Sequence, residues 1–254
     1  MGDMSRTRRL ARAWGIPAAL LGLAALSGWP VTTRQGVNGV VTVQRIPLWV
    51  KAAEFLVRDY RYRQLVGQIL KGRAQASDQE RVMAIFHWTT DRLRHWPRGW
   101  PLIDDHVYSI IVRGYGTADQ FADVFTTLCA YAGVPATLVK LMSADRASWY
   151  MGGVRLEGHW CVFDPYWGVY FEHSDGRPVT WQALIDDPTL LVSTRRGPSA
   201  SPMDYAALLR GSLAINPNAL RPYAQMPWLR LFQELWRWTL PLDRPATNRY
   251  HGAS

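Results

Sequence analysis

The residues best suited to covalent chemistry in this chain are its two cysteines, and both stand where a thiolate is disfavoured. Cys129 falls on the apolar stripe of a predicted helix, most of three turns after its start, where no dipole or base would lower the thiol pKa. Cys161 falls inside an alternating strand and is predicted to point away from Asp164. We expect Cys129 to be a buried small hydrophobe, and whether the two cysteines pair stays open.

Histidine is the second residue type that could do chemistry, and the six histidines show no metal-ligand spacing. His95 is predicted to be a solvated residue near a helix end. His106 alone has neighbouring carboxylates, in Ile103-Asp104-Asp105-His106, and two interpretations stay open. One is a ligand site or acid/base group, and the other is a loop leading into a short strand over Tyr108 to Val112. We expect no metal and no cofactor, since no phosphate-binding glycine loop or H-E-x-x-H pattern occurs.

The element that could best position a nucleophile is a predicted helix within Gly114 to Ala136, GYGTADQFADVFTTLCAYAGVPA. Thr117 is a good N-cap, and Gln120 completes a capping box with it. Apolar residues then recur at helical spacing until Gly133 and Pro135 end the helix. The first turn of such a helix offers N–H donors and the positive end of the macrodipole, which lower a thiol pKa and stabilise an oxyanion.

This segment resembles the transglutaminase-like superfamily, a branch of the papain-like cysteine hydrolases, in which Gly-x-Cys-x-Asp-Tyr-Ala opens the helix. The resemblance places Ala118 where the nucleophilic cysteine stands, because Gly116 precedes it by two residues. The exit turn also matches, in Ala132-Gly133-Val134-Pro135-Ala136. An alanine methyl cannot form a thioester.

A second matching stretch is Gly158-His159-Trp160-Cys161-Val162-Phe163-Asp164-Pro165, which is similar to the family's Gly-x-Trp-x-x-x-Asp-Pro strand. Asp164 matches the aspartate that orients the catalytic histidine. Counting back about fifteen residues, the family's commonest spacing, reaches Trp149, and no histidine lies between His106 and His159. The resemblance therefore retains the third triad member and lacks the first two.

The resemblance covers roughly residues 77 to 171 and implies an α+β fold with a papain-like core, in which helices pack on an antiparallel sheet with extra N-terminal and C-terminal helices. The patterns agree with this order of elements. Helices are predicted over Pro47 to Lys71, Ser77 to about Arg94 and from Thr117 onward, and strands over Thr137 to Met142, Trp149 to Leu156, Trp160 to Asp164 and Val169 to Phe171.

The chain divides into four predicted parts. They are a signal peptide or N-terminal membrane anchor (1–31), a linker or edge strand (32–46), a transglutaminase-like domain (47–177) and a C-terminal helical extension (178–254). Basic residues precede an apolar run from Ile16 to Leu26, which is short for a membrane span. This predicts export, with a periplasmic or inner-membrane-anchored location.

The predicted C-terminal helix and the net charge each allow more than one interpretation. The strongest helix of the extension is predicted over Met226 to Thr239, and it either docks on the domain or lies at a membrane or partner surface. The net charge is +9, and part of it comes from the targeting segment. The remaining arginines are dispersed without a basic run, so nucleic-acid binding is not expected, whereas attraction to anionic lipid or an acidic polymer is.

Two functions from different classes follow. The first is a non-catalytic protein of the bacterial cell envelope that binds a peptide, glycan or protein partner through the vestigial cleft, in polysaccharide export or assembly. The second is an active hydrolase or acyltransferase that uses Asp119, Asp164 and His106 in acid/base chemistry. Besides the triad positions Ala118, Trp149 and Asp164, the candidate cleft residues are Tyr115, Gly116, Thr117, Asp119, Gln120 and His106.

Overall fold

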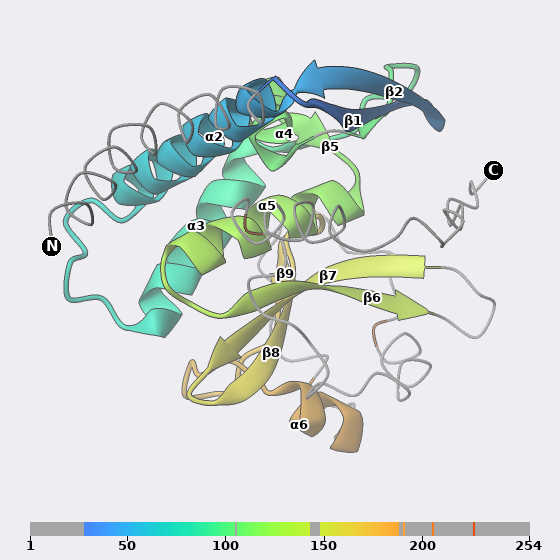
Figure 1. Ribbon diagram of the computed structural model, residues 1–254. Helices are drawn as coiled ribbons and strands as arrows, with labels where there is room; N and C mark the ends of the chain where they lie inside the picture. Colours follow the sequence, from blue (N-terminus) through green and yellow to red (C-terminus); the bar gives the residue numbers. More distant parts are fainter. Residues whose placement is uncertain are drawn as a thin grey trace, which may run out of the picture.

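The computed structural model describes residues 28–104, 106–142, 148–187, 190, 205 and 226, and Figure 1 shows the arrangement of its elements. The helices are α2 (Leu48–Ile69), α3 (Asp78–Arg92), α4 (Val107–Arg113), α5 (Ala118–Tyr131) and α6 (Trp181–Asp186). The strands are β1 (Pro30–Val37), β2 (Val40–Pro47), β3 (Arg94–His95), β4 (Ile103–Asp104), β5 (Tyr115–Gly116), β6 (Ala136–Met142), β7 (Ser148–Leu156), β8 (His159–Asp164) and β9 (Val169–Tyr170). The predicted α+β class is confirmed.

An antiparallel sheet with strand order β6-β7-β8-β9 forms the centre of the fold. Helices α3 and α5 cover one face of this sheet, and α6 lies on the other (Figure 1). The approach of α5 to β7 depends on Gly152, because a Cβ there would lie 2.4 Å from Phe125 Cδ1. Glycine at this position lets the helix rest directly on the strand.

Side-chain alternation along β8 divides the core into two clusters. Cys161 and Phe163 pack in the larger cluster beneath the helices, whereas Val162 packs in the smaller cluster with Trp181 of α6. Every second residue of a strand points to the same face, so one strand supplies both clusters. The same alternation places Asp164 on the α6 side of the sheet.

The helices predicted from Ser77 and from Thr117 are confirmed, and the four strands predicted between Thr137 and Phe171 agree with the structure within one residue at each end. Ser77 caps α3: its hydroxyl oxygen accepts from Glu80 N, and Ser77 N donates to the Glu80 carboxylate at 2.8 Å. This is the predicted capping box. Helix α5 buries ten of its fourteen residues, so it is the central helix of the domain.

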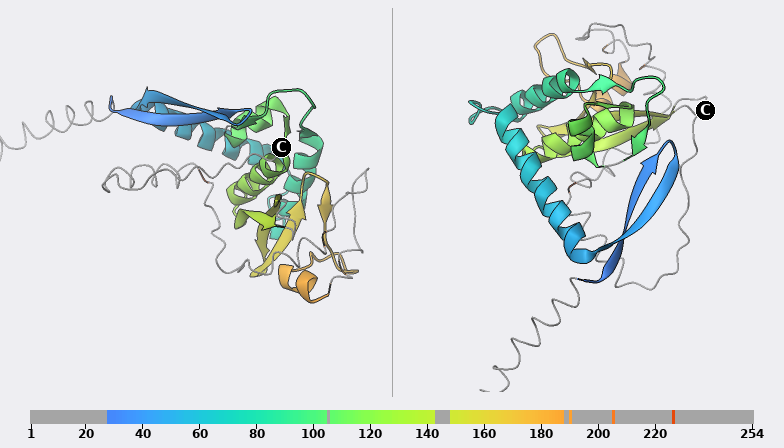
Figure 2. Two further views of the ribbon diagram at one scale, coloured as in Figure 1. Left: turned by 90° about the vertical axis from the view of Figure 1, so that its right-hand side faces the viewer. Right: turned by 90° about the horizontal axis from the view of Figure 1, so that it is seen from above.

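Residues 32–46, predicted to be a linker or edge strand, form most of a β-hairpin. Val37 pairs with Val40 across a two-residue turn of Asn38 and Gly39, both with positive φ (51° and 78°). Such turns match the twist of paired strands and favour the Asn-Gly sequence. The hairpin and α2 diverge from their junction at Pro47 and form an outer layer of the molecule (Figure 2).

The prediction of a short strand over Tyr108 to Val112 is wrong, because these residues lie in helix α4. Val107, Ile110 and Ile111 are buried at helical spacing, and Gly114 ends the helix in the left-handed conformation. Burial of one helical face against α5 outweighs the β-propensity of a run rich in branched residues.

Several predicted features lie outside the described residues. These are the N-terminal segment up to residue 27 and, apart from Met226 itself, the helix predicted over Met226 to Thr239. In the portion of the chain that the structure describes, no helix has both the length and the apolar character needed to cross a membrane.

Candidate functional site

Asp164, the last residue of β8, is fully buried, and its carboxylate accepts four hydrogen bonds. Oδ2 accepts from Trp149 Nε1 at 2.9 Å and from the Tyr205 hydroxyl at 2.9 Å. Oδ1 accepts from the backbone N–H groups of Tyr166 at 3.0 Å and Trp167 at 3.1 Å. None of these partners is a cation, so hydrogen bonds alone compensate for the burial of this group.

Burial raises the pKa of the Asp164 carboxyl above its ordinary value, although all four hydrogen bonds act in the opposite direction. The carboxyl is therefore shifted towards its neutral form. Burial and the four hydrogen bonds together hold the Asp164 carboxyl in one orientation.

Trp149 lies in β7 opposite Leu141 of β6, and its indole N–H points at Asp164. The structure thus brings together two of the three positions that the resemblance assigns to a triad. An indole nitrogen donates a hydrogen bond but cannot accept a proton. The Trp149–Asp164 pair keeps the hydrogen bond of a histidine–aspartate pair and lacks the base.

Tyr205 is a member of this site that sequence reasoning missed. It lies 41 residues after Asp164, is buried, and packs edge-on against Phe171 with ring centroids 5.5 Å apart. No motif surrounds it in the sequence, so no local signal could have identified it. One residue of the C-terminal extension therefore completes the hydrogen bonding of Asp164.

A set of rings that we call the aromatic cluster connects this carboxyl to helix α5. It consists of His95, Phe121, Trp149, Tyr166 and Trp167. The ring of Tyr166 lies 5.9 Å from that of Trp149 and 5.1 Å from that of Phe121, both edge-on. His95 stacks on Tyr166 at 4.0 Å with an interplanar angle of 11°. Rings at these separations and orientations attract one another beyond simple burial.

His95, predicted to be solvated, is exposed but also held in place. Its Nε2 lies 2.7 Å from the carbonyl oxygen of Tyr166, so this nitrogen carries the proton and donates. In the parallel pairing of β3 with β5, His95 lies opposite Gly116, two residues before Ala118. A two-residue strand leaves no pattern in the sequence, which is why this placement could not be predicted.

Ala118 is the first residue of α5 and is half-buried. Phe121, one turn later, belongs to the aromatic cluster, so the start of this helix and the Asp164 environment adjoin the same rings. Thr117 is the N-cap: its backbone N–H donates to Gln120 Oε1 at 3.3 Å, and its hydroxyl donates to Asp119. Thr117 and Asp119 are thereby engaged in closing the helix start.

Gln120 and Gly116 have packing roles around this turn. Gln120 Nε2 donates to Ile103 O at 2.6 Å, and its Oε1 accepts from Arg113 at 3.2 Å. A Cβ on Gly116 would lie 2.8 Å from Gln120 Oε1, so glycine allows this side chain its place. Tyr115 stacks under the Arg113 guanidinium, 5.0 Å from its ring centroid.

His106 lies away from these groups. It is the N-cap of α4 and lines a cavity of about 550 Å³ between α2, the β1–β2 hairpin and α4. The contacts of Asp119 and of Asp164 do not include His106. The structure therefore does not assemble the acid/base set of Asp119, Asp164 and His106.

The prediction that Cys129 is buried is confirmed; Cys161 is buried as well, and both are free. Burial raises the pKa of the Cys129 thiol well above its ordinary range. Burial, and to a smaller extent the charge of Glu157, raises the pKa of Cys161 to about 12. Neither thiol is a nucleophile at neutral pH. No group of three His, Cys, Asp or Glu side chains among the described residues is placed to hold a metal ion.

Comparison with known proteins identifies one domain. Residues 63–165 match the model of the transglutaminase-like superfamily. This range includes α3, α5 and strands β6 to β8, and it contains the Ala118, Trp149 and Asp164 positions. None of the curated proteins compared with the chain matches it.

Three solved structures are similar over about half of the chain. A candidate cysteine protease from Cytophaga hutchinsonii is 16% identical, with 47% of this chain and 40% of that chain covered and a TM-score of 0.37. A candidate protease from Parabacteroides distasonis is 12% identical, with coverages of 54% and 36% and a TM-score of 0.34. A TGase is 13% identical, with coverages of 53% and 43% and a TM-score of 0.31. The chain thus spans about two fifths of the length of each, and scores this low add nothing to the domain match.

Proposed function

Since residues 63–165 form a transglutaminase-like domain, we propose that this chain is a non-catalytic member of that superfamily, which binds a peptide, glycan or protein partner. The site that we assign to binding, called the cleft below, consists of the first turn of α5 and the aromatic cluster, beneath which Asp164 is buried. One observation carries the proposal: at the position that the resemblance assigns to the catalytic histidine, the side chain that donates to Asp164 is the indole of Trp149.

The absence of acyl-transfer chemistry follows from what the cleft side chains can do. A thioester needs a thiolate, and Ala118 offers a methyl group at the start of α5. Proton transfer to and from the reacting groups needs a base, and the Trp149 indole cannot take up a proton. Asp164 is fully hydrogen-bonded and buried, so it cannot act in place of either.

The aromatic cluster and the start of α5 can still bind a ligand. Trp149, Tyr166 and Trp167 are half-buried and His95 is exposed, so the aromatic cluster is open on one side. Aromatic walls with a few fixed polar groups are typical of ligand sites. The positive end of the α5 macrodipole favours a carbonyl or carboxylate oxygen nearby. An extended peptide or an acyl-substituted sugar chain fits this combination.

The cellular setting is part of the same proposal. The basic residues and apolar run within residues 1–31 support export across a bacterial inner membrane, with the domain in the periplasm or anchored to that membrane. A role in polysaccharide export or assembly would place the cleft next to glycan chains.

Purified wild-type protein tests the catalytic half of the proposal. We expect no hydrolysis of fluorogenic peptide amides or nitrophenyl esters above the buffer rate. Turnover by the wild type that Asp164→Asn abolishes would overturn the proposal.

An Ala118→Cys variant tests the binding half, since the new thiol reports on the cleft from within. We expect it to react with iodoacetamide much faster than the buried Cys129 and Cys161, because it stands at a helix N-terminus. Peptidoglycan stem peptides or soluble glucan oligosaccharides should slow this reaction. Gln182→Cys, exposed on α6, is the control and should react at the same rate with and without them. Equal slowing at both positions, or at neither, would contradict binding in the cleft.

A further inference from the structure

The exposed large apolar side chains of the described residues gather at one end of the molecule. Of eleven such side chains, nine lie between residues 29 and 60. We call this region the hairpin–α2 face, and its members are Trp29, Val37, Val40, Val41, Val43, Trp49, Leu56, Val57 and Tyr60. Alternation along the strands puts Val37 and Val40 on one side of the hairpin and Val41 and Val43 on the other, and Trp49 and Val57 line the cavity between the hairpin and α2. Single exposed apolar residues are ordinary, whereas a cluster of this kind marks an interaction site.

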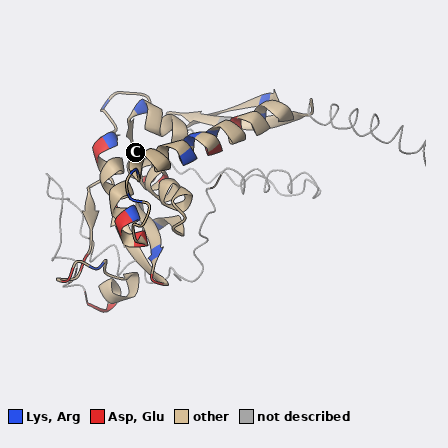
Figure 3. Ribbon diagram, turned by 90° about the vertical axis from the view of Figure 1, so that its left-hand side faces the viewer, with Lys and Arg blue, Asp and Glu red and all other residues tan. Residues whose placement is uncertain are grey.

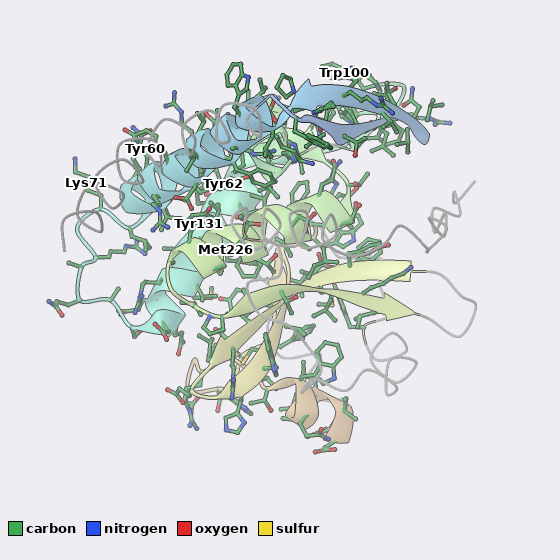
Figure 4. All side chains as sticks on the ribbon, viewed as in Figure 1. Tyr60, Tyr62, Lys71, Trp100, Tyr131 and Met226 are labelled. Carbon is green, nitrogen blue, oxygen red and sulfur yellow. The ribbon has the colours of Figure 1, made fainter. Side chains whose placement is uncertain are left out.

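Helix α2 shows the pattern most clearly, because it is apolar on two sides. Phe55, Tyr62 and Val66 recur at helical spacing and are buried, and Tyr62 and Val66 pack in the larger core cluster of the domain. Leu56 and Tyr60 follow on another side of the helix and are 73% and 62% exposed. Figure 4 shows Tyr60 on the outer side of α2 and Tyr62 on the inner side. A helix that only covered its own domain would be polar on its outer side.

The hairpin and α2 meet at Pro47, and both line the cavity of about 550 Å³ between them and α4. They form the outer layer of the molecule, with α5 between this layer and the β6–β9 sheet (Figures 1 and 2). Trp100, 55% exposed, lies beside the hairpin, whose turn residue Asn38 exchanges hydrogen bonds with the backbone of Leu102. The apolar side chains therefore belong to one end of the molecule rather than to scattered loops.

Sequence and charge identify what this face contacts. The apolar run from Ile16 to Leu26 ends three residues before Trp29, so the face directly follows a segment suited to lipid. Residues 29–71 contain seven Lys and Arg side chains against two carboxylates, and Figure 3 shows both kinds of charge along α2. Tryptophan and tyrosine, which this face presents, prefer the boundary between hydrocarbon and water.

From these observations we propose that the hairpin–α2 face lies against the surface of a lipid bilayer that contains anionic lipid. The apolar side chains that do not line the cavity, Leu56 and Tyr60 foremost, enter the headgroup region. The exposed basic side chains of Arg45, Arg61 and Lys71 pair with lipid phosphates, whereas Arg58 is buried and Arg63 is paired with Asp59. This contact would add to any anchorage by the N-terminal segment and would fix the orientation of the domain on the membrane. It does not depend on what the cleft binds.

The test places an environment-sensitive fluorophore on single introduced cysteines of the full chain. Leu56→Cys reports on the face, and His159→Cys, exposed on β8, is the control. Background labelling is low because Cys129 and Cys161 are 0% and 3% exposed. With phosphatidylcholine/phosphatidylglycerol vesicles, we expect a blue shift and quenching by lipid-borne nitroxide at position 56 and neither at position 159. Without phosphatidylglycerol or at high salt, the effect at position 56 should weaken.

Two results would overturn the proposal. One is vesicle-bound protein whose fluorophores at positions 56 and 159 behave alike, which would leave the N-terminal segment as the whole attachment. The other is a blue shift at position 56 that grows with protein concentration in the absence of vesicles, which would assign the face to a second copy of the chain. Tyr60→Cys serves as a replacement probe if the Leu56→Cys protein does not keep the wild-type unfolding midpoint.

Discussion

Replacing Asp164 by asparagine tests whether its carboxyl stabilises the fold through hydrogen bonds. The substitution keeps the shape of the side chain but exchanges one of two acceptor oxygens for an NH₂ group. If the amide oxygen stays with the backbone N–H groups of Tyr166 and Trp167, the NH₂ faces Trp149 and Tyr205. The tyrosine hydroxyl can rotate and accept, whereas the indole N–H can only donate.

The expected loss of stability follows from the hydrogen bonds that the substitution breaks or weakens. One buried donor loses its acceptor, which costs about 1–3 kcal/mol, and the three remaining hydrogen bonds lose the assistance of a charge. Part of this loss is regained, because the variant no longer has to bury a charged group away from water. We expect Asp164→Asn to lower the free energy of unfolding by about 2–4 kcal/mol at pH 7.

The pH dependence of this difference has a definite sign. The pKa of Asp164 is raised in the folded state, so the folded wild type binds its proton more tightly than the unfolded chain does. Lowering the pH from 7 through the raised pKa therefore stabilises the wild type, and this gain is complete near the unfolded pKa of about 3.9. The asparagine variant has no such gain, so the gap between the two proteins should widen towards pH 4.

Urea unfolding followed by far-ultraviolet circular dichroism at pH 7 and near pH 4.5 measures both quantities. Asp91→Asn is the matched control, because Asp91 is exposed on α3 and its substitution should leave the midpoint unchanged. An Asp164→Asn protein as stable as the wild type at pH 7 would refute the reasoning from hydrogen bonds. A gap that narrows at low pH would refute the reasoning from burial.

Three further substitutions test the packing, each by the shift of the urea midpoint. Gly152→Ala should destabilise the protein by about 2–3 kcal/mol, because its methyl would lie 2.4 Å from Phe125. Gly67→Ala is its counterpart in an exposed helix with nothing within 4 Å of the new Cβ, and it should stabilise the protein by up to about 1 kcal/mol. Ser77→Ala removes one half of the capping box with Glu80 and should cost about 1 kcal/mol; no change would mean that water replaces the cap.

The core of the fold was predictable because its signals are local. The Ser77 and Thr117 caps and the period-2 strands after Pro135 each reflect a few neighbouring residues. The hairpin had such a signal as well, since Asn38-Gly39 between two runs of Val, Thr and Gln is typical of a tight turn. Helix α4 had none, because only packing against α5 decides between helix and strand for its branched residues.

The candidate site was predictable only in part, for a related reason. Trp149 and Asp164 could be paired from their spacing, because two neighbouring antiparallel strands carry them. His95 reaches the aromatic cluster through a two-residue parallel strand, and Tyr205 comes from beyond the domain match. Contacts between segments so far apart in the sequence form only in the folded chain, so no local stretch of sequence could predict them.

The hydrogen bond between Trp149 and Asp164 also indicates that an aspartate at this position can have a structural role without a catalytic one. A buried carboxyl at the end of β8 needs donors whatever the protein does, and backbone N–H groups satisfy only one of its oxygens. The other oxygen accepts from side chains, the Trp149 indole of β7 and the Tyr205 hydroxyl, and an imidazole at position 149 can supply the same kind of N–H donor. Trp149→His alone should therefore keep a donor for Asp164, lose packing against Tyr166 and still give no turnover, because no thiolate stands at Ala118. If that single variant hydrolysed amides, the role that we assign to Asp164 would be wrong.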